Sequence, residues 1–312
     1  MLVGWRMASD GPPVVLVTGA DSFTARYATP QLERAGFRVV GTVRHAAPDV
    51  KEMACDLTNP TEVHAALEAL RPQYVLHLAG ITHLAHGDRS DFYRVNLLGT
   101  FNLLNAMDQV GLQPKKIVIA SSGNVYGNAN VEPISESTPA CPISDYAVSK
   151  LAMEQMAQLW FERFPIIIAR PFNYTGVGQS TAFLLPKIVD HYRRRAPVIE
   201  LGNVDVARDF SDVRTIAECY ARMLGCEHSG QVVNICSGTG TTIRQILNAM
   251  EGISGHRLEV RSNPALVRRN EIERLVGSFQ KLVEMVGPLP RMGLEETLRW
   301  MFEEPAGTVG AA

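Results

Sequence analysis

The sequence predicts an α/β fold in which a doubly wound parallel sheet is followed by a smaller C-terminal lobe. Three observations support this class. Short, almost entirely apolar runs recur along the first half of the chain, and such runs suit strands that are buried on both faces of a parallel sheet. Segments with helical periodicity alternate with these runs, which is typical of βαβ units. After Arg170-Pro171 the alternation becomes irregular, and glycines and prolines interrupt it.

The predicted elements follow one another without long gaps. The apolar run at 14–17 is stopped by Thr18-Gly19, and the helical pattern that follows is closed by Gly36. Strands and helices then alternate with the lengths that right-handed crossovers need. In chain order, we expect strands at 14–17, 37–43, 74–78, 116–120 and 166–168, and helices at 23–35, 61–70, 92–110 and 146–163.

The same pattern predicts the domain organisation. Residues 1–13 are expected to be a flexible lead-in, and residues 14–174 form the first domain. Residues 175–312 form mainly the second lobe, but segments near 210–215 and 231–238 are expected to return to the first domain.

The composition excludes several function classes. The 312 residues carry a net charge of −2, whereas a general nucleic-acid binder is usually strongly basic. No apolar run approaches the roughly 20 residues that cross a bilayer, and the N-terminus lacks the apolar segment of a signal peptide. The five cysteines form no CxxC pair, which is typical of free thiols in a reducing cytoplasm. The histidines show no HExxH or similar spacing, so no metal site is expected.

The turn after the first strand has the position of a dinucleotide phosphate loop. It joins a buried strand to a helix, and a helix N-terminus favours a pyrophosphate group. A GxxGxxG pattern would place glycine at positions 19, 22 and 25, but only Gly19 is glycine here. Ser22 and Ala25 are small enough for close approach, although Ser22 must tolerate the backbone angles that glycine would take. We expect an NAD(P)-binding Rossmann domain with Gly19, Asp21, Ser22 and Phe23 at the cofactor; a plain strand–helix turn is the alternative.

Residues after three further strands fit the same cofactor. Asp56-Leu57 offers an acceptor for the adenine amino group, and Leu78-Ala79-Gly80 offers small residues against which a cofactor could lie. At Arg44, a carboxylate would bind the ribose hydroxyls of NAD, whereas arginine pairs with the 2′-phosphate of NADP. NADP(H) is therefore favoured, with NAD(H) and a merely solvated Arg44 as the alternatives.

Tyr146-Ala147-Val148-Ser149-Lys150 is a YxxxK motif that points to catalysis. On a helix, this spacing places Tyr146 and Lys150 on one face. A tyrosine titrates near about 10, and a nearby ammonium group lowers its pKa. Tyr146 is then a suitable proton donor to a carbonyl that receives hydride, and Ser122 would hydrogen-bond the same oxygen. An ordinary amphipathic helix is the alternative for the motif alone.

Four further blocks of sequence accompany these motifs: Ser121-Ser122-Gly123-Asn124-Val125-Tyr126-Gly127, Ala169-Arg170-Pro171-Phe172-Asn173, Asp205-Val206-Ala207-Arg208-Asp209-Phe210 and Asn234-Ile235-Cys236-Ser237-Gly238. Together, the motifs and blocks resemble the extended short-chain dehydrogenase/reductases that modify nucleotide-activated sugars. Within that group, the blocks are similar to the GDP-4-keto-6-deoxy-mannose reductases that form GDP-rhamnose. The resemblance extends over residues 14–300 and implies cytoplasmic deoxysugar biosynthesis. It adds Lys150, Asn96 and Pro171 to the cofactor-binding residues.

The same resemblance separates the reactions. Sugar-nucleotide 4,6-dehydratases carry Thr-Asp-Glu where this chain has Ser122, Gly123 and Asn124, so the acid and base for water elimination are absent. A C4 epimerase that retains NAD is the main alternative to an NADPH-dependent 4-ketoreductase. The remaining alternative functions are a 4,6-dehydratase and a non-catalytic dinucleotide sensor.

The resemblance also implies contacts to a nucleotide-sugar substrate. Arg208 and Arg268 match positions that typically pair with the diphosphate or the nucleotide, and the planar fork of arginine suits this role. A surface charge or a structural ion pair is the alternative for each. Family members often pair through helices that match 92–110 and 146–163, so a homodimer is expected. The complete set of expected substrate contacts is Thr82, His83, Asn124, Asn173, Lys187, Arg208 and Arg268.

Overall fold

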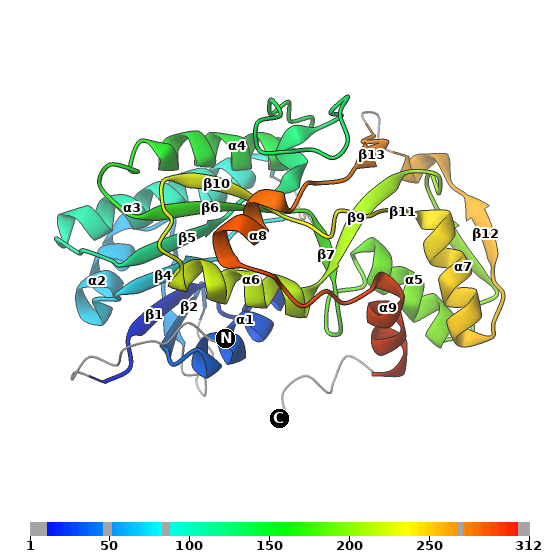
Figure 1. The fold of residues 1–312 in the computed structure, drawn as a ribbon, viewed down its shortest axis with the longest axis horizontal. Helices are drawn as coiled ribbons and strands as arrows, with labels where there is room; N and C mark the ends of the chain where they lie inside the picture. Colours follow the sequence, from blue (N-terminus) through cyan, green and yellow to red (C-terminus); the bar gives the residue numbers. More distant parts are fainter. Residues whose placement is uncertain (1–10, 46–51, 83–87, 268–270, 305–312) are drawn as a thin grey trace. The chain divides into compact units, whose positions relative to one another are not determined.

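The computed structural model of the chain describes residues 11–45, 52–82, 88–267 and 271–304. Its main feature is a seven-stranded sheet with the order β10-β6-β5-β4-β1-β2-β3 (Figure 1). The pairs β1–β2, β2–β3, β1–β4 and β4–β5 are parallel, and the strand order runs outward from β1 in both directions. The α/β class with a Rossmann-type sheet is thereby confirmed. The strands are β1 (Val14–Thr18), β2 (Arg38–Val43), β3 (Met53–Ala54), β4 (Tyr74–His77), β5 (Lys116–Ala120), β6 (Ile166–Pro171) and β10 (Gln231–Ile235).

The central strands are apolar because neither of their faces meets solvent. Val15, Leu16 and Val17 of β1 are at most 2% exposed, and Val75 and Leu76 of β4 are fully buried. This burial explains why the runs show no alternation of polar and apolar residues. The helices that accompany these strands are α1 (Phe23–Arg34), α2 (Pro60–Leu70), the π-helical segment η1 (Phe92–Leu98), α3 (Gly99–Gln109), the 3₁₀ turn η2 (Gly123–Tyr126), α4 (Asp145–Gln158) and α6 (Val213–Gly225).

The helix predicted at 146–163 ends earlier, at Gln158. From Leu159 to Phe161 the backbone N–H groups donate three residues back, and that of Trp160 meets the carbonyl of Ala157 at 3.1 Å. The ring of Trp160 stacks on Phe164 at 5.8 Å, which favours this tighter turn. Leu159 is 83% exposed, so the helix has no apolar contact at that point to extend it.

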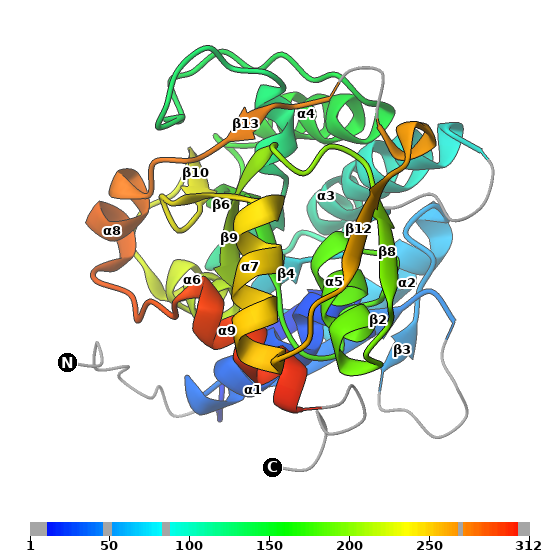
Figure 2. The same cartoon turned by 90° about the vertical axis from the view of Figure 1, so that its right-hand side faces the viewer.

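The C-terminal half contributes two smaller sheets. In one, β9 pairs with β11, β13 and β7, and in the other β8 pairs with β12. Helices α5, α7 and α9 pack against one another around a core that includes Tyr192, Ile246 and Met301 (Figure 2). The elements are β7 (Asn173–Thr175), α5 (Leu184–Arg193), β8 (Val198–Leu201), β9 (Ala207–Asp212), β11 (Gly240–Thr242), α7 (Ile243–Ser254), β12 (Glu259–Ser262), η3 (Pro264–Leu266), β13 (Arg274–Leu275), α8 (Gln280–Val286) and α9 (Leu294–Glu303).

The chain folds into two compact units, each built from three segments. The first unit comprises residues up to Ala120, Ala152–Ile167 and Tyr220–Gln231. The second comprises Ser121–Leu151, Ile168–Cys219 and the residues from Val232 onward. The chain passes between the two units several times, so each unit contains segments from distant parts of the sequence.

A buried carboxylate organises the loops of the second unit. Asp209 of β9 is fully buried and accepts hydrogen bonds from the backbone N–H groups of Ser237, Gly238 and Gly277 at 2.7, 2.8 and 3.3 Å. The Ser237 hydroxyl donates a further bond at 2.6 Å. Burial raises the pKa of Asp209, although these donors act in the opposite direction. Asp209 therefore joins three segments that are distant in the sequence.

Replacing Asp209 with asparagine should destabilise the protein. Asp209→Asn turns one acceptor oxygen into a donor that faces backbone N–H groups, so we expect the free energy of unfolding to fall by about 1–3 kcal/mol. Urea denaturation measures this change. The control is Asp205→Asn, since Asp205 forms a solvent-exposed pair with Arg244 and its replacement should change the stability little. Equal losses in the two variants would contradict the role of Asp209.

Candidate active site

The phosphate turn depends on glycine at position 19. Gly19 has a φ of +67°, which disfavours residues with a side chain. A Cβ atom added there would lie 2.9 Å from the Cα of Ala79, at the end of β4. The turn therefore packs closely against the backbone segment that follows β4.

Ser22 replaces the second glycine of the pattern without strain. Its φ of −69° and ψ of 156° are ordinary extended values, and its hydroxyl accepts a hydrogen bond from the N–H of Ala25 at 3.2 Å. Serine thus caps the N-terminus of α1, which is a role that glycine cannot fill with a side chain. Asp21 is exposed in the turn, and Phe23 begins the helix with an edge contact to Tyr27 at 5.6 Å. The residues present fit a dinucleotide phosphate at this helix end.

A buried histidine connects the ends of β1 and β4. His77 is 2% exposed, with Nδ1 at 2.7 Å from the Thr18 hydroxyl and Nε2 at 2.8 Å from the Thr100 hydroxyl. Thr100 donates its only hydroxyl hydrogen to the carbonyl of Asn96 at 2.7 Å, so Nε2 of His77 must be the donor to Thr100. Nδ1 then accepts from Thr18, whose oxygen accepts from the N–H of Ala79 at 3.2 Å. This network assigns a neutral tautomer to His77 and fixes the end of β4.

Asn96 fixes the segment that follows β4. Its Oδ1 accepts from the N–H of Ile81 at 2.8 Å, and its Nδ2 donates to the carbonyl of Ile81 at 3.1 Å. Asn96 is 1% exposed and lies in the π-helical segment η1, a kind of helix that often occurs at functional sites. Asn96 was predicted as a cofactor contact, and the structure gives it a positioning contact. Leu78-Ala79-Gly80 leads into this segment, Thr82 is exposed, and His83 lies outside the described residues.

Arg44 and Asp56 lie together in the first unit. Nε of Arg44 is 3.3 Å from Oδ2 of Asp56, with side-chain exposures of 61% and 26%. Thr58 donates to Oδ1 of Asp56 from its N–H at 2.9 Å and from its hydroxyl at 2.8 Å. Burial opposes the effect of these donors, but the hydrogen bonds from Thr58 and Arg44 prevail and lower the pKa of Asp56. Leu57 is buried against Gly99, where an added Cβ would lie 3.2 Å away.

The second unit holds the catalytic candidates. Ser122 follows β5 in the chain and caps η2, where its hydroxyl accepts from the N–H of Asn124 at 3.2 Å. The Ser122 hydroxyl is also hydrogen-bonded to the hydroxyl of Tyr146. Ser122 is 6% exposed. Because Ser122 accepts from Asn124, its one hydroxyl hydrogen can be donated to Tyr146, as in this structure, or to a ligand oxygen in its place.

Tyr146 and Lys150 lie on α4 at the predicted spacing. Ser144 caps this helix, since its hydroxyl accepts from the N–H of Ala147 at 3.2 Å and its carbonyl from that of Val148 at 2.8 Å. Tyr146 is therefore in the first turn. Lys150 follows four residues later on the same face and is 5% exposed.

The pKa of Tyr146 moves in the direction opposite to the prediction. Burial raises it to about 12, the hydrogen bond from Ser122 opposes the rise, and the neighbouring Tyr174 adds to it. The prediction of a lowered pKa is wrong for this structure, because the loss of hydration around the phenol outweighs the hydrogen bond from Ser122. Tyr146 is consequently protonated at neutral pH, as a proton donor must be.

Gly123 leaves no room for a side chain. A Cβ atom added at this position would lie 2.8 Å from the ring of Phe172, which is 4% exposed. Phe172 packs in turn against Tyr126, with 6.1 Å between ring centroids. An acidic side chain at position 123 would therefore have to displace a buried aromatic ring. The structure thus gives a physical reason for the missing carboxylate.

A buried polar network supports η2 and was missed in the sequence. Nη1 of Arg170 donates to the Tyr126 hydroxyl at 2.8 Å, and that hydroxyl donates to Oδ1 of Asn234 at 2.8 Å. The guanidinium also lies 4.8 Å from the centre of the Tyr126 ring. All three residues stand in the motif blocks quoted above, but only as markers of a family. The missing signal was their burial, since buried polar groups need partners.

Asn173 carries an unsatisfied donor. Within the described part of the chain, its Nδ2 is the one buried side-chain nitrogen or oxygen that has no hydrogen-bond partner. Asn173 begins β7 and pairs with Phe210 of β9. Leaving a buried donor unpaired costs about 1–3 kcal/mol, so such a group is a good candidate for a ligand contact.

The remaining substrate candidates have backbone partners. Nη1 of Arg208 donates to the carbonyls of Ala207 at 2.9 Å and Glu273 at 3.3 Å. Nζ of Lys187 donates to the carbonyl of Glu200 at 2.9 Å. These contacts hold the charged groups of the Arg208 and Lys187 side chains in place. Pro171 ends β6, and Arg268 lies outside the described residues.

The described residues contain no cluster of three or more His, Cys, Asp or Glu side chains arranged to hold a metal ion. None of their helices is both long and apolar enough to cross a membrane.

Known proteins resemble the chain over most of its length. The model of the NAD dependent epimerase/dehydratase family matches residues 15–236. A GDP-6-deoxy-D-talose 4-dehydrogenase of Aggregatibacter actinomycetemcomitans is 32% identical and covers 88% of this chain and 91% of its own length. A GDP-6-deoxy-D-mannose reductase of Pseudomonas aeruginosa is 36% identical, with coverages of 75% and 80%. The structure of RMD from P. aeruginosa complexed with NADPH has a TM-score of 0.82, is 31% identical and covers 94% of this chain and 97% of its own.

A methyl group at position 19 should impair the phosphate turn. Gly19→Ala forces a side chain against Ala79 at an unfavourable φ, so we expect weaker NADPH binding and a stability loss of more than about 1 kcal/mol. Fluorescence titration and thermal denaturation measure the two effects. Gly36→Ala is the matched control, because Gly36 has a φ of +88° but an added Cβ meets nothing within 4 Å. That variant should lose stability without losing affinity, and unchanged NADPH binding in Gly19→Ala would refute the assignment.

Proposed function

Because this chain belongs to the NAD dependent epimerase/dehydratase family, we propose that it reduces the C4 ketone of a GDP-linked 4-keto-6-deoxyhexose with NADPH. The observation that carries the proposal is the hydrogen-bonded pair of Ser122 and a protonated Tyr146, next to Gly123, where no carboxylate fits. A ketone reduction needs a proton donor, whereas a 4,6-dehydration also needs an acid and a base for removing water.

The relatives support the choice of substrate. One bears the name of a GDP-6-deoxy-D-mannose reductase and another that of a GDP-6-deoxy-D-talose 4-dehydrogenase. Both names combine a GDP-linked 6-deoxyhexose with redox chemistry. The P. aeruginosa structure with NADPH supports the choice of cofactor.

Each candidate residue has its own role in the proposed reaction. The turn at Gly19, the N-terminus of α1 and Arg44 would hold the dinucleotide, and Lys150 would hold its nicotinamide ribose. When bound, NADPH supplies the hydride that the ketone carbon accepts. Tyr146 gives its phenolic proton to the ketone oxygen, so that a ketone, a hydride and a proton become a secondary alcohol. Ser122 stabilises the charge that develops on that oxygen by donating a hydrogen bond.

The substrate would be held by the second unit. We assign the buried Nδ2 of Asn173 to an oxygen of the sugar nucleotide, because this donor has no partner among the described residues. Arg208 and Lys187 would place positive charge near the diphosphate.

Turnover of NADPH tests the function directly. The purified protein should consume NADPH, followed by its absorbance, when GDP-4-keto-6-deoxy-mannose is added. Tyr146→Phe should lower kcat by about 10²–10⁴-fold with little change in NADPH affinity, because only the proton donor is removed. Absence of turnover with this and other nucleotide 4-ketosugars would overturn the proposal. Interconversion of nucleotide sugars without net redox change would indicate a C4 epimerase instead.

The raised pKa of Tyr146 predicts the pH dependence of reduction. A group with a pKa of about 12 keeps its proton throughout the neutral and mildly alkaline range, and it loses the donor form only as the pH rises through that value. We therefore expect kcat for reduction to show no fall from the ionisation of Tyr146 below about pH 10. A pH profile measured at saturating NADPH and substrate checks this. A fall near neutral pH that Lys150→Met abolishes would show that the ammonium group dominates over burial.

Arg44 should set the preference for NADPH. Arg44→Ala removes the cation that would pair with the 2′-phosphate, so we expect KM for NADPH to rise by about 10–100-fold and KM for NADH to change little. Arg38→Ala is the control, because Arg38 is an exposed arginine at the other end of β2. Equal changes for both cofactors would contradict the assignment.

A further inference from the structure

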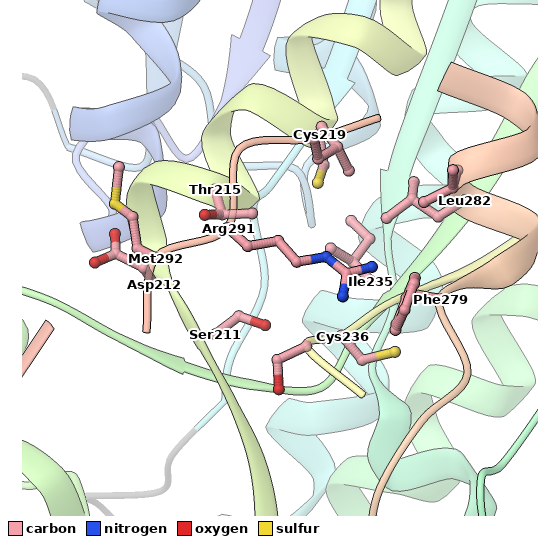
Figure 3. Close-up of a pocket in the computed structure, with 13 residues that line it drawn as sticks. Ser211, Asp212, Thr215, Cys219, Ile235, Cys236, Phe279, Leu282, Arg291 and Met292 are labelled. Carbon is pink, nitrogen blue, oxygen red and sulfur yellow. The ribbon is translucent and has the colours of Figure 1, made fainter. Parts of the chain in front are cut away.

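A pocket lies within the second unit, and none of its lining residues takes part in the proposed reaction (Figure 3). Its walls come from the end of β9, the first half of α6, the end of β10, α8 and the segment that joins α8 to α9. None of the catalytic, cofactor-binding or substrate-binding candidates described above lines it. The pocket therefore needs an explanation of its own.

One cation reaches into this pocket. In Figure 3 the side chain of Arg291 extends inward and ends between Ile235 and Phe279. Its guanidinium carbon lies 3.7 Å from the centre of the Phe279 ring, which orients the planar group. No carboxylate in the described ranges forms an ion pair with Arg291.

The one acid that lines the pocket is already neutralised. Asp212 receives Nε and Nη2 of Arg214 at 3.0 and 2.8 Å, and the Thr297 hydroxyl at 2.8 Å. Its side chain is fully buried, so this arrangement is stable. Arg291 itself is exposed, and no carboxylate of the described residues competes with a ligand for its guanidinium group.

Two hydroxyl groups accompany Arg291. Ser211 is 6% exposed, its hydroxyl points into the pocket in Figure 3, and it forms no side-chain hydrogen bond within the part of the chain that the structure describes. The Thr215 hydroxyl lies 3.4 Å from the carbonyl of Pro290, which is a long contact for a hydroxyl donor. Both hydroxyls are consequently available to a ligand oxygen.

The two cysteines that line the pocket do not give it a chemical function. Cys219 and Cys236 are 0% and 8% exposed. Burial raises the pKa of Cys236, and the nearby Asp209 and Glu136 act in the same direction. The thiol therefore stays protonated and is neither a nucleophile nor a metal ligand at neutral pH.

The size of the cavity limits the ligand. Its volume is about 50 Å³. Since about 10–15 Å³ holds one water molecule on this scale, the cavity admits about four water-sized groups. This matches a carboxylate or phosphoryl group and excludes a nucleotide.

We propose that this pocket binds a small oxyanion, a carboxylate or a phosphoryl group, through Arg291 and the hydroxyls of Ser211 and Thr215. The guanidinium pairs with two oxygens of the ligand, and the hydroxyls donate to them. Part of the lining is apolar, including Leu282 and Met292. The ligand links the segment between α8 and α9 to β9.

Inorganic phosphate and acetate are suitable probes. Each should raise the Tm of the full-length protein in a saturable manner, compared with sodium chloride of equal ionic strength. Arg291→Gln should weaken this binding by about tenfold or more, and Ser211→Ala should weaken it to a smaller extent. A stronger effect of phosphate than of acetate identifies a phosphoryl ligand, and the reverse identifies a carboxylate.

Two control variants make the test decisive. Arg299→Gln removes the same charge from α9 but does not line the pocket, so the response to phosphate should persist. Arg208→Gln alters the proposed nucleotide-sugar site, and the response should persist there as well. Circular dichroism confirms that each variant is folded. Equal responses in Arg291→Gln and the wild type, or a response lost only in Arg208→Gln, would overturn the proposal without affecting the proposed function.

Discussion

The hydrogen bonds of His77 are the constraint on which the cofactor end of the first unit depends. They join Thr18 at the end of β1 to Thr100 in α3, and the proton arrangement admits only one tautomer. Because Thr18 also receives the N–H of Ala79, the backbone after β4 is held at the distance that excludes any side chain at Gly19. Because these groups are buried, leaving any one of them without a hydrogen-bond partner would cost about 1–3 kcal/mol of stability.

Hydrogen bonds between buried groups also position the catalytic candidate Ser122 in the second unit. Ser122 owes its orientation to η2, and η2 is supported by the hydrogen bonds that connect Tyr126 with Arg170 and Asn234. The same packing that seats Phe172 over Gly123 removes the space for an acid. The packing of Phe172 thus limits which side chains position 123 can carry. A change at Phe172 would alter the chemistry that position 123 can support.

Local patterns in the sequence were sufficient for β1, β2, β4, β5 and β6, the turn at Gly19 and the start of α4, because burial on two faces and helical spacing leave local signals. Other features depend on distant partners. Asp209 could not be assigned, since its donors stand 28 and 68 residues away. The end of α4 at Gln158 depends on the stacking of Trp160 on Phe164. The pKa of Tyr146 was misjudged because spacing reveals a neighbouring ammonium group but not the loss of water around the phenol.

Exposure decides which arginines of this protein can serve ligands. Arg44 forms an exposed pair with Asp56, and such pairs contribute about 0–1 kcal/mol, so exchanging the carboxylate for a phosphate costs little. Arg214 pairs with a carboxylate that is fully buried, and breaking such a pair costs about 3–5 kcal/mol. Arg291 pairs with no carboxylate in the described ranges, so an anion there replaces only water. We therefore propose a ligand-binding role for arginine at positions 44 and 291 and a structural role at position 214.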